Sequence, residues 1–290
     1  MRAGDGGKGP IEEIGEKIDN LNRIPLKLSV ILSISLASFF VYYDVSNYSY
    51  ISPVLRNVWN VTDAEIAIGA SLTIVGYLIG AISITILSDS KGRKNAFVVS
   101  ILLLGAGSIL AALSQNITHL IAFRFITGAG IGSELAVVSV YIAEMSPRAK
   151  RGKYTSFLAI LGWVGLTSSG PVSLALLQGQ FLGVEGWRIV LGIAGVVALA
   201  CLPFRLQMPE SPRWLASKGK FRETNDVLRS MGMAKLESST PVERKTHRDF
   251  QSLKSKTSLL RIAFLVSVWF LVYIPIYSAL LLVIAYIDQG

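Results

Sequence analysis

Four long stretches of this chain contain no aspartate, glutamate, lysine or arginine, and this constrains the fold more than any other feature of the sequence. A helix needs roughly 20 predominantly apolar residues to cross the hydrocarbon core of a bilayer. Only 16% of the 290 residues are charged, against about 25% in a typical soluble domain. The sequence therefore predicts an all-α membrane protein. The four stretches are residues 66–88, 95–118, 154–177 and 262–287.

Three further apolar stretches bring the predicted number of spans to seven. Residues 189–204 form a shorter uncharged run, and the arginines at its ends, Arg188 and Arg205, are long enough to reach the two membrane interfaces. The other two stretches, residues 28 to about 54 and 120–143, carry the charged residues Asp44, Arg124 and Glu134. Ionisable side chains inside spans are rare and are by default functional candidates.

Lysine and arginine are distributed unevenly between the connections. When connections alternate between the two sides, one side holds the N-terminal tail, "DSKGRK", "PRAKRGK" and the basic segment 205–261, whereas the other holds only Arg56 and Arg188. This positive-inside pattern places the N-terminus in the cytoplasm and the end of the seventh span outside. We expect a multi-pass protein of the cell membrane. The net charge of +9 does not indicate a nucleic-acid partner, because basic and aromatic residues are not interleaved.

The chain divides into four predicted regions. They are a cytoplasmic N-terminal tail (1–27), a six-helix transmembrane domain (28–206), a cytoplasmic linker with short helices (207–258) and the seventh transmembrane helix (259–290). In the linker, "PESPRWLASKG" predicts a helix with Ser211 as N-cap, Pro212 in the first turn and Gly219 at its end. "KFRETNDVLRSMG" predicts a second short helix before Gly232. Both are expected in the cytoplasm or at the membrane interface.

Two of the buried charges lie at the same predicted depth. Asp44 is ~24 Å along the first span, and Arg124 is ~6 Å into the fourth span, which enters a core of ~30 Å from the other side. An acid and a guanidinium at equal depth in neighbouring helices offset each other's desolvation. Such a pair is able to take up a proton when it breaks, although a purely structural pair is the alternative interpretation.

Glu134 lies ~21 Å along the fourth span, near its other end. No lysine or arginine partner for it is evident within the spans. We therefore expect Glu134 to be protonated, to face a water-filled cavity or to face a ligand.

Glycines in two of the spans are spaced four residues apart, as Gly76 with Gly80 and Gly128 with Gly132. Small residues at this spacing allow helix backbones to approach closely in a membrane. We expect these glycines to pack helices and not to bind phosphate.

Three motifs occur in a characteristic order, namely "DSKGRK", then "RFITGAGIG" followed by "YIAEMSPRAKRG", then "PESPRWL". Together they resemble the major facilitator superfamily, in its sugar porter and general substrate transporter branch. The resemblance covers residues 28 to about 270. It implies a six-helix bundle of 3+3 inverted repeats, a solute site between two such bundles, and alternating access by rocking. Because such proteins have twelve spans, we expect a fold that is truncated to the first bundle and the seventh helix.

The resemblance also implies roles for individual residues. Asp44 and Arg124 correspond to the proton-coupling pair, and Glu134, Tyr43 and Asn47 are expected to line the substrate cavity. A network of gating residues is expected to latch the outward-facing state. Its members are Asp89, Gly92, Arg93, Lys94, Glu144, Arg151, Gly152, Glu210 and Arg213. Without the resemblance, these charges would be solvated loop residues of little energetic weight.

Some positions depart from the family pattern. Thr85 and Ser90 replace a glycine and a basic residue of the loop motif, which weakens the expected latch. Ala159 and Leu166 stand where sugar-transporting relatives place glutamines, so a hexose loses hydrogen-bond partners. "GIGSE", with Glu134, resembles relatives that move phosphate, organic acids or organic cations. These features favour an organic ion, an organic acid or phosphate over a hexose.

We therefore expect a secondary active transporter, a proton symporter, with the solute, the proton, the lipid bilayer and a second copy or another chain as partners. The alternative is a non-transporting truncated or regulatory half-transporter that needs a partner chain. An enzyme is not expected, because the spans hold no histidine and no nucleophile with its base. Neither a cofactor nor a metal is expected, since Cys201, His119 and His247 are the only cysteine and histidines.

Overall fold

A computed structural model describes residues 9–181, 183–236, 255, 257–268 and 271–272. The chain divides into two compact units, Met1–Thr240 and Pro241–Gly290. In the second unit the described residues include one apolar helix, Thr257–Val268. Most of the predicted seventh span, 259–290, lies outside the described residues.

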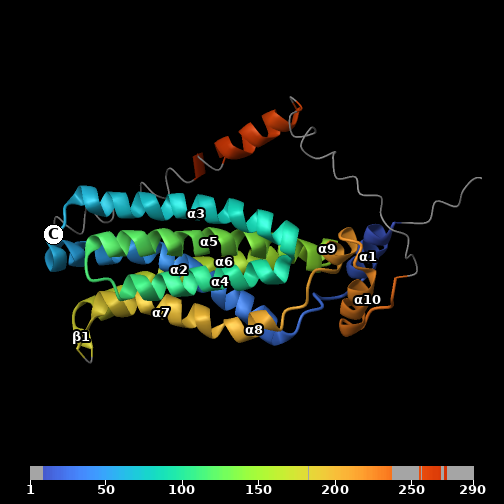
Figure 1. The fold of residues 1–290 in the computed structure, drawn as a ribbon, viewed down its shortest axis with the longest axis horizontal. Helices are drawn as coiled ribbons and strands as arrows, with labels where there is room; N and C mark the ends of the chain where they lie inside the picture. Colours follow the sequence, from blue (N-terminus) through green and yellow to red (C-terminus); the bar gives the residue numbers. More distant parts are fainter. Residues whose placement is uncertain (1–8, 182, 237–254, 256, 269–270, 273–290) are drawn as a thin grey trace, which may run out of the picture. The chain divides into compact units, whose positions relative to one another are not determined.

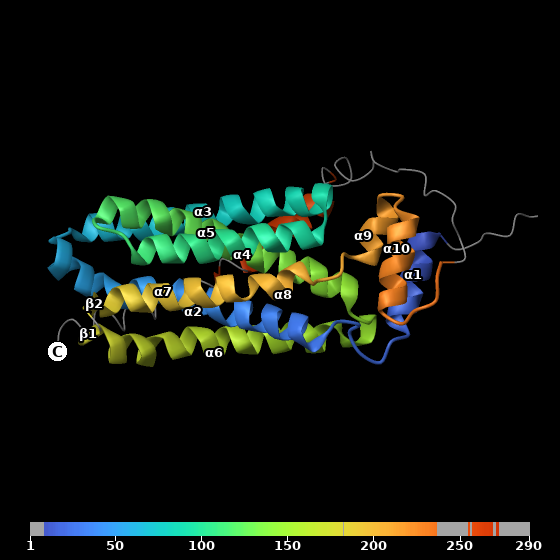
Figure 2. The same cartoon turned by 60° about the horizontal axis from the view of Figure 1, so that its bottom comes forward.

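The first unit contains six long apolar helical segments, which run alongside one another (Figures 1 and 2). Five are continuous, and the sixth consists of α7 and the short α8 that follows it at Cys201. All six are long and apolar enough to cross a membrane, which confirms six predicted spans. Their bounds are α2 Leu28–Trp59, α3 Asp63–Lys91, α4 Arg93–Ala112, α5 Ile117–Met145, α6 Arg151–Leu177, α7 Gly186–Ala200 and α8 Leu202–Leu206.

The glycine pairs pack α3 against α5. A Cβ atom added to Gly80 would overlap the backbone of Ala129, and one added to Gly132 would overlap the carbonyl of Tyr77. Gly76 and Gly128 meet the facing backbone in the same way. The predicted close-packing role of the GxxxG spacing is therefore confirmed.

Short elements occupy the two ends of the bundle. At one end lie the helices α1 Pro10–Asp19, α9 Pro212–Ser217 and α10 Phe221–Ser230, together with the 3₁₀ helix Arg148–Lys150. At the other end, β1 Gln180–Phe181 pairs antiparallel with β2 Val184–Glu185. Figure 2 shows α9 and the β-hairpin at opposite ends of the bundle. We name these the α9 end and the hairpin end.

Both predicted linker helices are present. Ser211 caps α9 by accepting a hydrogen bond from the backbone N–H of Trp214, and Pro212 is in the first turn. Gly219 follows α9 with a φ of 73°, in the left-handed region that favours glycine. α10 ends just before Gly232, which also has a positive φ.

Helix α1 is a finding that the sequence analysis does not predict. Its buried residues Ile14 and Ile18 form an apolar cluster with Ala216 and Leu228. A search for long uncharged runs passes over this helix, because most of its other residues are polar or charged. The spacing of its isoleucines along one helical face was the available signal.

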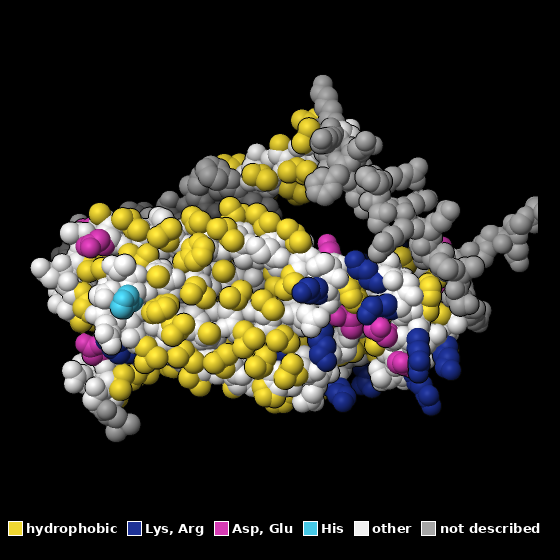
Figure 3. Space-filling view, viewed as in Figure 1, with side chains coloured by type: hydrophobic (Ala, Val, Ile, Leu, Met, Phe, Trp, Pro, Cys, Tyr) yellow, Lys and Arg dark blue, Asp and Glu magenta, His cyan; other side chains and the backbone are white. Residues whose placement is uncertain are grey.

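The surface of the bundle is apolar between its ends. Figure 3 shows hydrophobic side chains over the bundle and a concentration of Lys and Arg at the α9 end. The exposed apolar side chains of α3 and α6 include Ile68, Ile74, Leu78, Ile82, Ile86, Ile160, Trp163 and Leu174. This surface is suited to lipid contact.

Candidate functional site: buried ion pairs and a charge cluster

Asp44 on α2 and Arg124 on α5 form an ion pair inside the bundle. Their side chains are 0% and 1% exposed. Ser108 on α4 donates a hydrogen bond of 2.7 Å to the second carboxylate oxygen of Asp44. The Arg124 guanidinium lies 5.5 Å from the centre of the Tyr48 ring. The juxtaposition predicted from equal depth is therefore confirmed.

Several polar atoms around this pair have no hydrogen-bond partner within the described part of the chain. They are the hydroxyl of Tyr43, the side-chain oxygen of Asn47 and Nε of Arg124. The Asn47 amide donates to the carbonyl of Val190 at 3.3 Å. Because buried polar atoms are normally hydrogen-bonded, this region offers sites for water or for a polar ligand group.

Glu134 is paired, contrary to expectation. Its carboxylate forms an ion pair with Arg205 on α8, and both side chains are fully buried. Ser100 on α4 donates to its other oxygen at 2.6 Å. The prediction that Glu134 lacks a basic partner is wrong, and so is the placement of the Arg205 side chain at the membrane interface. Helical side chains tilt toward the helix N-terminus, so an arginine at the end of this span reaches back into the bundle.

A hollow of about 140 Å³ opens between α2, α5 and α6. Its polar lining consists of the hydroxyls of Ser38, Tyr42, Ser139 and Thr155, next to Ala159. None of its lining residues is charged, and none of Tyr43, Asn47 and Glu134 is among them.

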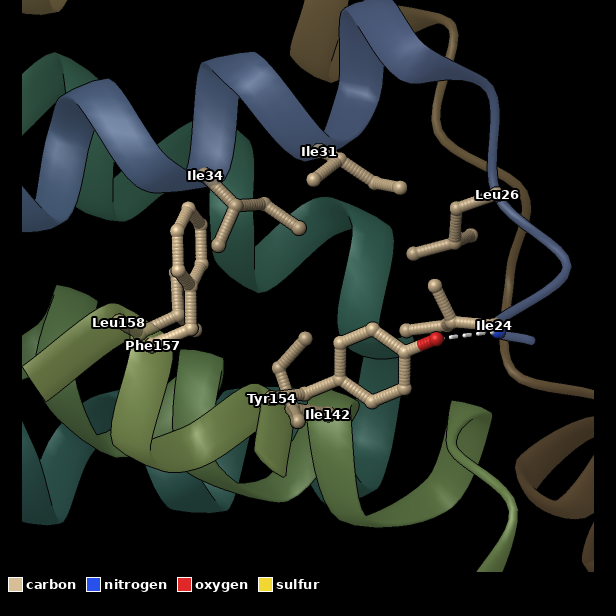
Figure 4. A pocket seen from close by; sticks show the side chains of 8 residues that line it. All are labelled: Ile24, Leu26, Ile31, Ile34, Ile142, Tyr154, Phe157 and Leu158. Atoms are coloured by element: carbon tan, nitrogen blue, oxygen red, sulfur yellow. Dashed lines mark hydrogen bonds between the residues drawn. The ribbon is translucent and has the colours of Figure 1, made fainter. Parts of the chain in front are cut away.

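A second, smaller hollow is lined mainly by apolar side chains near the start of α2 (Figure 4). There the backbone N–H of Ile24 donates to the hydroxyl of Tyr154 at 3.0 Å. With a volume of about 20 Å³, it has room for little more than one water molecule.

Charged residues from α3, α4 and α5 and from the segment that precedes α9 meet at the α9 end. Arg93 donates to Glu144 at 2.7 and 3.2 Å and to Asp89 at 2.6 Å. The Glu210 carboxylate accepts hydrogen bonds from the backbone N–H groups of Arg93 and Lys94, at 2.8 and 3.2 Å. It thus caps the positive end of the α4 dipole. We call these five residues, with Gly92, the charge cluster.

The conformation of Gly92 is required by this arrangement. Its φ is 102°, and a Cβ atom there would overlap the Glu210 carboxylate. Burial raises the pKa of the Glu210 carboxyl, and its N–H donors and Arg93 oppose this rise.

Three predicted gating residues are not bonded to the charge cluster. Arg151 donates to the carbonyl of Ser146 at 3.3 Å, and a Cβ atom at Gly152 would meet nothing within 4 Å. Arg213 on α9 forms no ion pair among the described residues. Burial, and then the charge of Arg151, lower the pKa of Arg213.

The sequence analysis missed Ser100, Ser108 and Arg205 as partners of the buried acids. The two serines are eight residues apart on α4 and therefore share one face. This spacing was a usable signal. Trp214 was also missed, and its indole N–H donates to the Asp89 carbonyl at 3.0 Å.

Known proteins agree with this architecture. The family described as "Sugar (and other) transporter" matches residues 28–284. Polyol transporter 5 of Arabidopsis thaliana is 33% identical over 213 residues, which are 73% of this chain and 39% of that protein. The niacin transporter NiaP of Acinetobacter baylyi is 27% identical over 264 residues, which are 89% of this chain and 59% of that protein.

A solved structure also shares the fold. The proton:xylose symporter XylE of the major facilitator superfamily aligns with a TM-score of 0.64 and 23% identity, over 71% of this chain and 49% of that one. The chain thus spans about half the length of the proteins it matches. The family and these relatives are transporters and not enzymes, as expected. The chain is a multi-pass membrane protein that belongs to the sugar (and other) transporter family of the major facilitator superfamily.

Proposed function

We propose that this chain forms one half of a secondary active transporter, which moves a small solute by alternating access together with a proton bound at Asp44. The observation that carries this proposal is the buried Asp44–Arg124 pair. Inside an apolar bundle each of the two charges is stabilised by the other, because an unpaired charge there is strongly unfavourable.

Proton binding to Asp44 would release Arg124. The carboxylate is held by one guanidinium and one hydroxyl, so a proton removes the charge that binds Arg124. The guanidinium, with its Nε already unpartnered, would then be available to a new acceptor. A carboxylate or phosphate on the solute has the geometry to accept from a guanidinium.

We therefore propose a small organic acid or phosphate as the solute, carried together with a proton. The ion pair of Glu134 with Arg205 removes the reason to favour an organic cation. Ala159 lines the hollow at a position where an amide would hold a hexose, which supports the preference against hexoses. The name of one relative, a niacin transporter, also fits a small organic solute.

We further propose that the α9 end faces the cytoplasm of a cell membrane, with the N-terminus on that side. The concentration of basic residues at this end supports the orientation. The proposed regions remain 1–27, 28–206, 207–258 and 259–290, with α1 inside the first. The charge cluster would act there as a gate.

The solute site would be completed by more polypeptide. Since relatives are about twice as long, the second half would come from a continuation of this chain, a second copy or a partner chain. The alternative function is that of a non-transporting regulatory half that needs a partner chain.

The transport proposal is tested with Asp44→Asn in proteoliposomes. Asparagine keeps an oxygen that can accept from Arg124 but cannot carry a proton, so solute-driven proton uptake should be lost while solute exchange continues. Asp63→Asn is the matched control, because Asp63 lies at the hairpin end with a side chain 81% exposed. Proton coupling that survives in Asp44→Asn would refute the assignment, and absence of solute exchange in the parent protein would favour the regulatory alternative.

A further inference from the structure

The Glu134–Arg205 pair is separate from the Asp44–Arg124 pair. Glu134 follows Arg124 by ten residues on α5, which corresponds to ~15 Å along the helix axis toward the α9 end. Both members are fully buried, and the proposed transport mechanism does not use them.

A short segment, in which Arg205 and Met208 are buried, connects this pair to the charge cluster. Residues 205–210 begin at the Arg205 side chain and end at Glu210, which caps α4. Between them, Met208 is 2% exposed within the apolar core. The carbonyl of Pro209 accepts a hydrogen bond of 2.9 Å from the hydroxyl of Tyr141 on α5. Because the segment is short, a displacement of Arg205 would also displace Glu210 from the start of α4.

Glu134 compensates the positive charge of the buried Arg205 side chain. No other acidic partner of Arg205 is found in the described part of the chain, and its Nε has no partner there. Its other contacts are weak, namely the Met208 sulfur at 3.9 Å and the Phe97 ring at 4.5 Å. If Glu134 became neutral, a buried guanidinium would lose its counter-ion, a situation that favours movement toward water.

Few titratable groups surround Glu134. Ser100 and Phe97 face the pair from α4, Cys201 lies at the junction of α7 and α8, and Tyr141 lies two helical turns along α5. Farther toward the α9 end are Arg93, Glu144 and Glu210 of the charge cluster.

We propose that Glu134 is a second proton-binding site, whose ion pair with Arg205 holds segment 205–210, so that protonation of Glu134 releases this segment and loosens the charge cluster. The release would link proton binding inside the bundle to the proposed gate. This functional role of the release rests on the transport proposal, but the release itself is measurable without any solute.

Cysteine labelling in membranes tests the release. Cys201 is the only cysteine, so Cys201→Ala provides a background into which Met208→Cys places a single buried thiol. The neighbouring Gln207 is exposed, and Gln207→Cys reports the intrinsic pH dependence of the maleimide reaction. The measured quantity is the ratio of the labelling rates at positions 208 and 207, between pH 8 and pH 5 and with no solute.

We expect the ratio to be low at pH 8 and to rise as the pH falls. In Glu134→Gln it should be high at every pH, by on the order of tenfold or more, because the counter-ion of a buried charge is gone. The double variant Glu134→Gln/Arg205→Met lacks both charges, so its ratio should be low and independent of pH. That result would distinguish release from misfolding.

Other results would overturn the proposal. They are a ratio that does not change with pH in the parent, a Glu134→Gln ratio equal to the parent value, and a double variant as reactive as Glu134→Gln. Asp44→Asn should leave the ratio unchanged, and an effect equal to that of Glu134→Gln would show that the two sites are not separate. If the labelling results are as expected but the parent protein shows no transport in proteoliposomes, only the transport proposal is refuted.

Discussion

Asp44 and Asp89 are both aspartates that pair with an arginine, but their surroundings differ. Asp44 and its partner Arg124 are 0% and 1% exposed, whereas the Asp89 side chain is 68% exposed beside Arg93 at 9%. Solvent stabilises an unpaired Asp89, whereas the Asp44 side chain has no exposure to bulk solvent in this conformation. Similar contacts therefore have different energetic weight, and only the buried pair makes charge neutralisation a condition for movement.

The largest effect is expected for Asp44→Ala. Arg124 would remain buried without a counter-ion, so the free energy of unfolding should fall by about 3–5 kcal/mol. Thermal or denaturant unfolding of the purified protein in detergent measures this loss. Asp44→Ala/Arg124→Met should recover most of it, because neither charge remains. If the single variant were as stable as the parent, the pair would not be the dominant buried interaction that we describe.

A somewhat smaller effect is expected for Gly80→Ala, which tests an uncharged contact between α3 and α5. The added Cβ would meet backbone atoms of Ala129, which cannot move aside as a side chain can, so a loss of about 1–3 kcal/mol is expected. Gly192→Ala on α7 is the matched control, since its Cβ would lie 3.8 Å from Ala112, an ordinary contact. An equal loss in both variants would mean that the close approach of α3 and α5 is not required.

At the α9 end, Glu210→Gln should have a smaller effect that depends on pH. Burial raises the pKa of the Glu210 carboxyl, so the folded protein holds this proton more tightly than the unfolded chain does. The resulting stability is present below the ordinary range of a glutamate and is lost as the pH rises through the raised pKa.

Glu210→Gln should therefore gain stability relative to the parent as the pH rises above the ordinary range of a glutamate and through the raised pKa of Glu210. Unfolding at several pH values measures this difference. Glu223→Gln on α10 is the control, because that side chain is 56% exposed and pairs with the exposed Lys220. A difference that decreased with rising pH would show that the N–H donors, and not burial, control Glu210.

The spans and the Asp44–Arg124 pair could be predicted from the sequence because both follow from position along the helix axis alone. Uncharged length predicts a span, and counting 1.5 Å per residue from either side predicts equal depth. Ser211 and Gly219 were likewise predictable as the boundaries of α9, because capping acts between near neighbours in the chain.

The partner of Glu134 could not be found in this way. Arg205 lies at the boundary of an uncharged run, where depth alone assigns it to the interface. Its inward direction depends on the tilt of its side chain and on the packing of α8 against α4, which are three-dimensional properties. The separation of Arg213 from the charge cluster is also a property of packing, and the motif "PESPRWL", which includes Arg213, does not reveal it.

The smallest effect is expected for Asp89→Ala, the counterpart of Asp44→Ala. Arg93 would keep its two hydrogen bonds to Glu144 and its contact with Ser88, so the charge would remain compensated. The loss of stability should be less than about 1 kcal/mol and should shrink further at high salt, since the lost partner is mostly exposed. Unfolding in detergent at low and high salt measures both quantities. If Asp89→Ala cost as much as Asp44→Ala, exposure would not explain the difference between the two pairs, and the charge cluster would be a structural element of the bundle and not a gate able to open at low energetic cost.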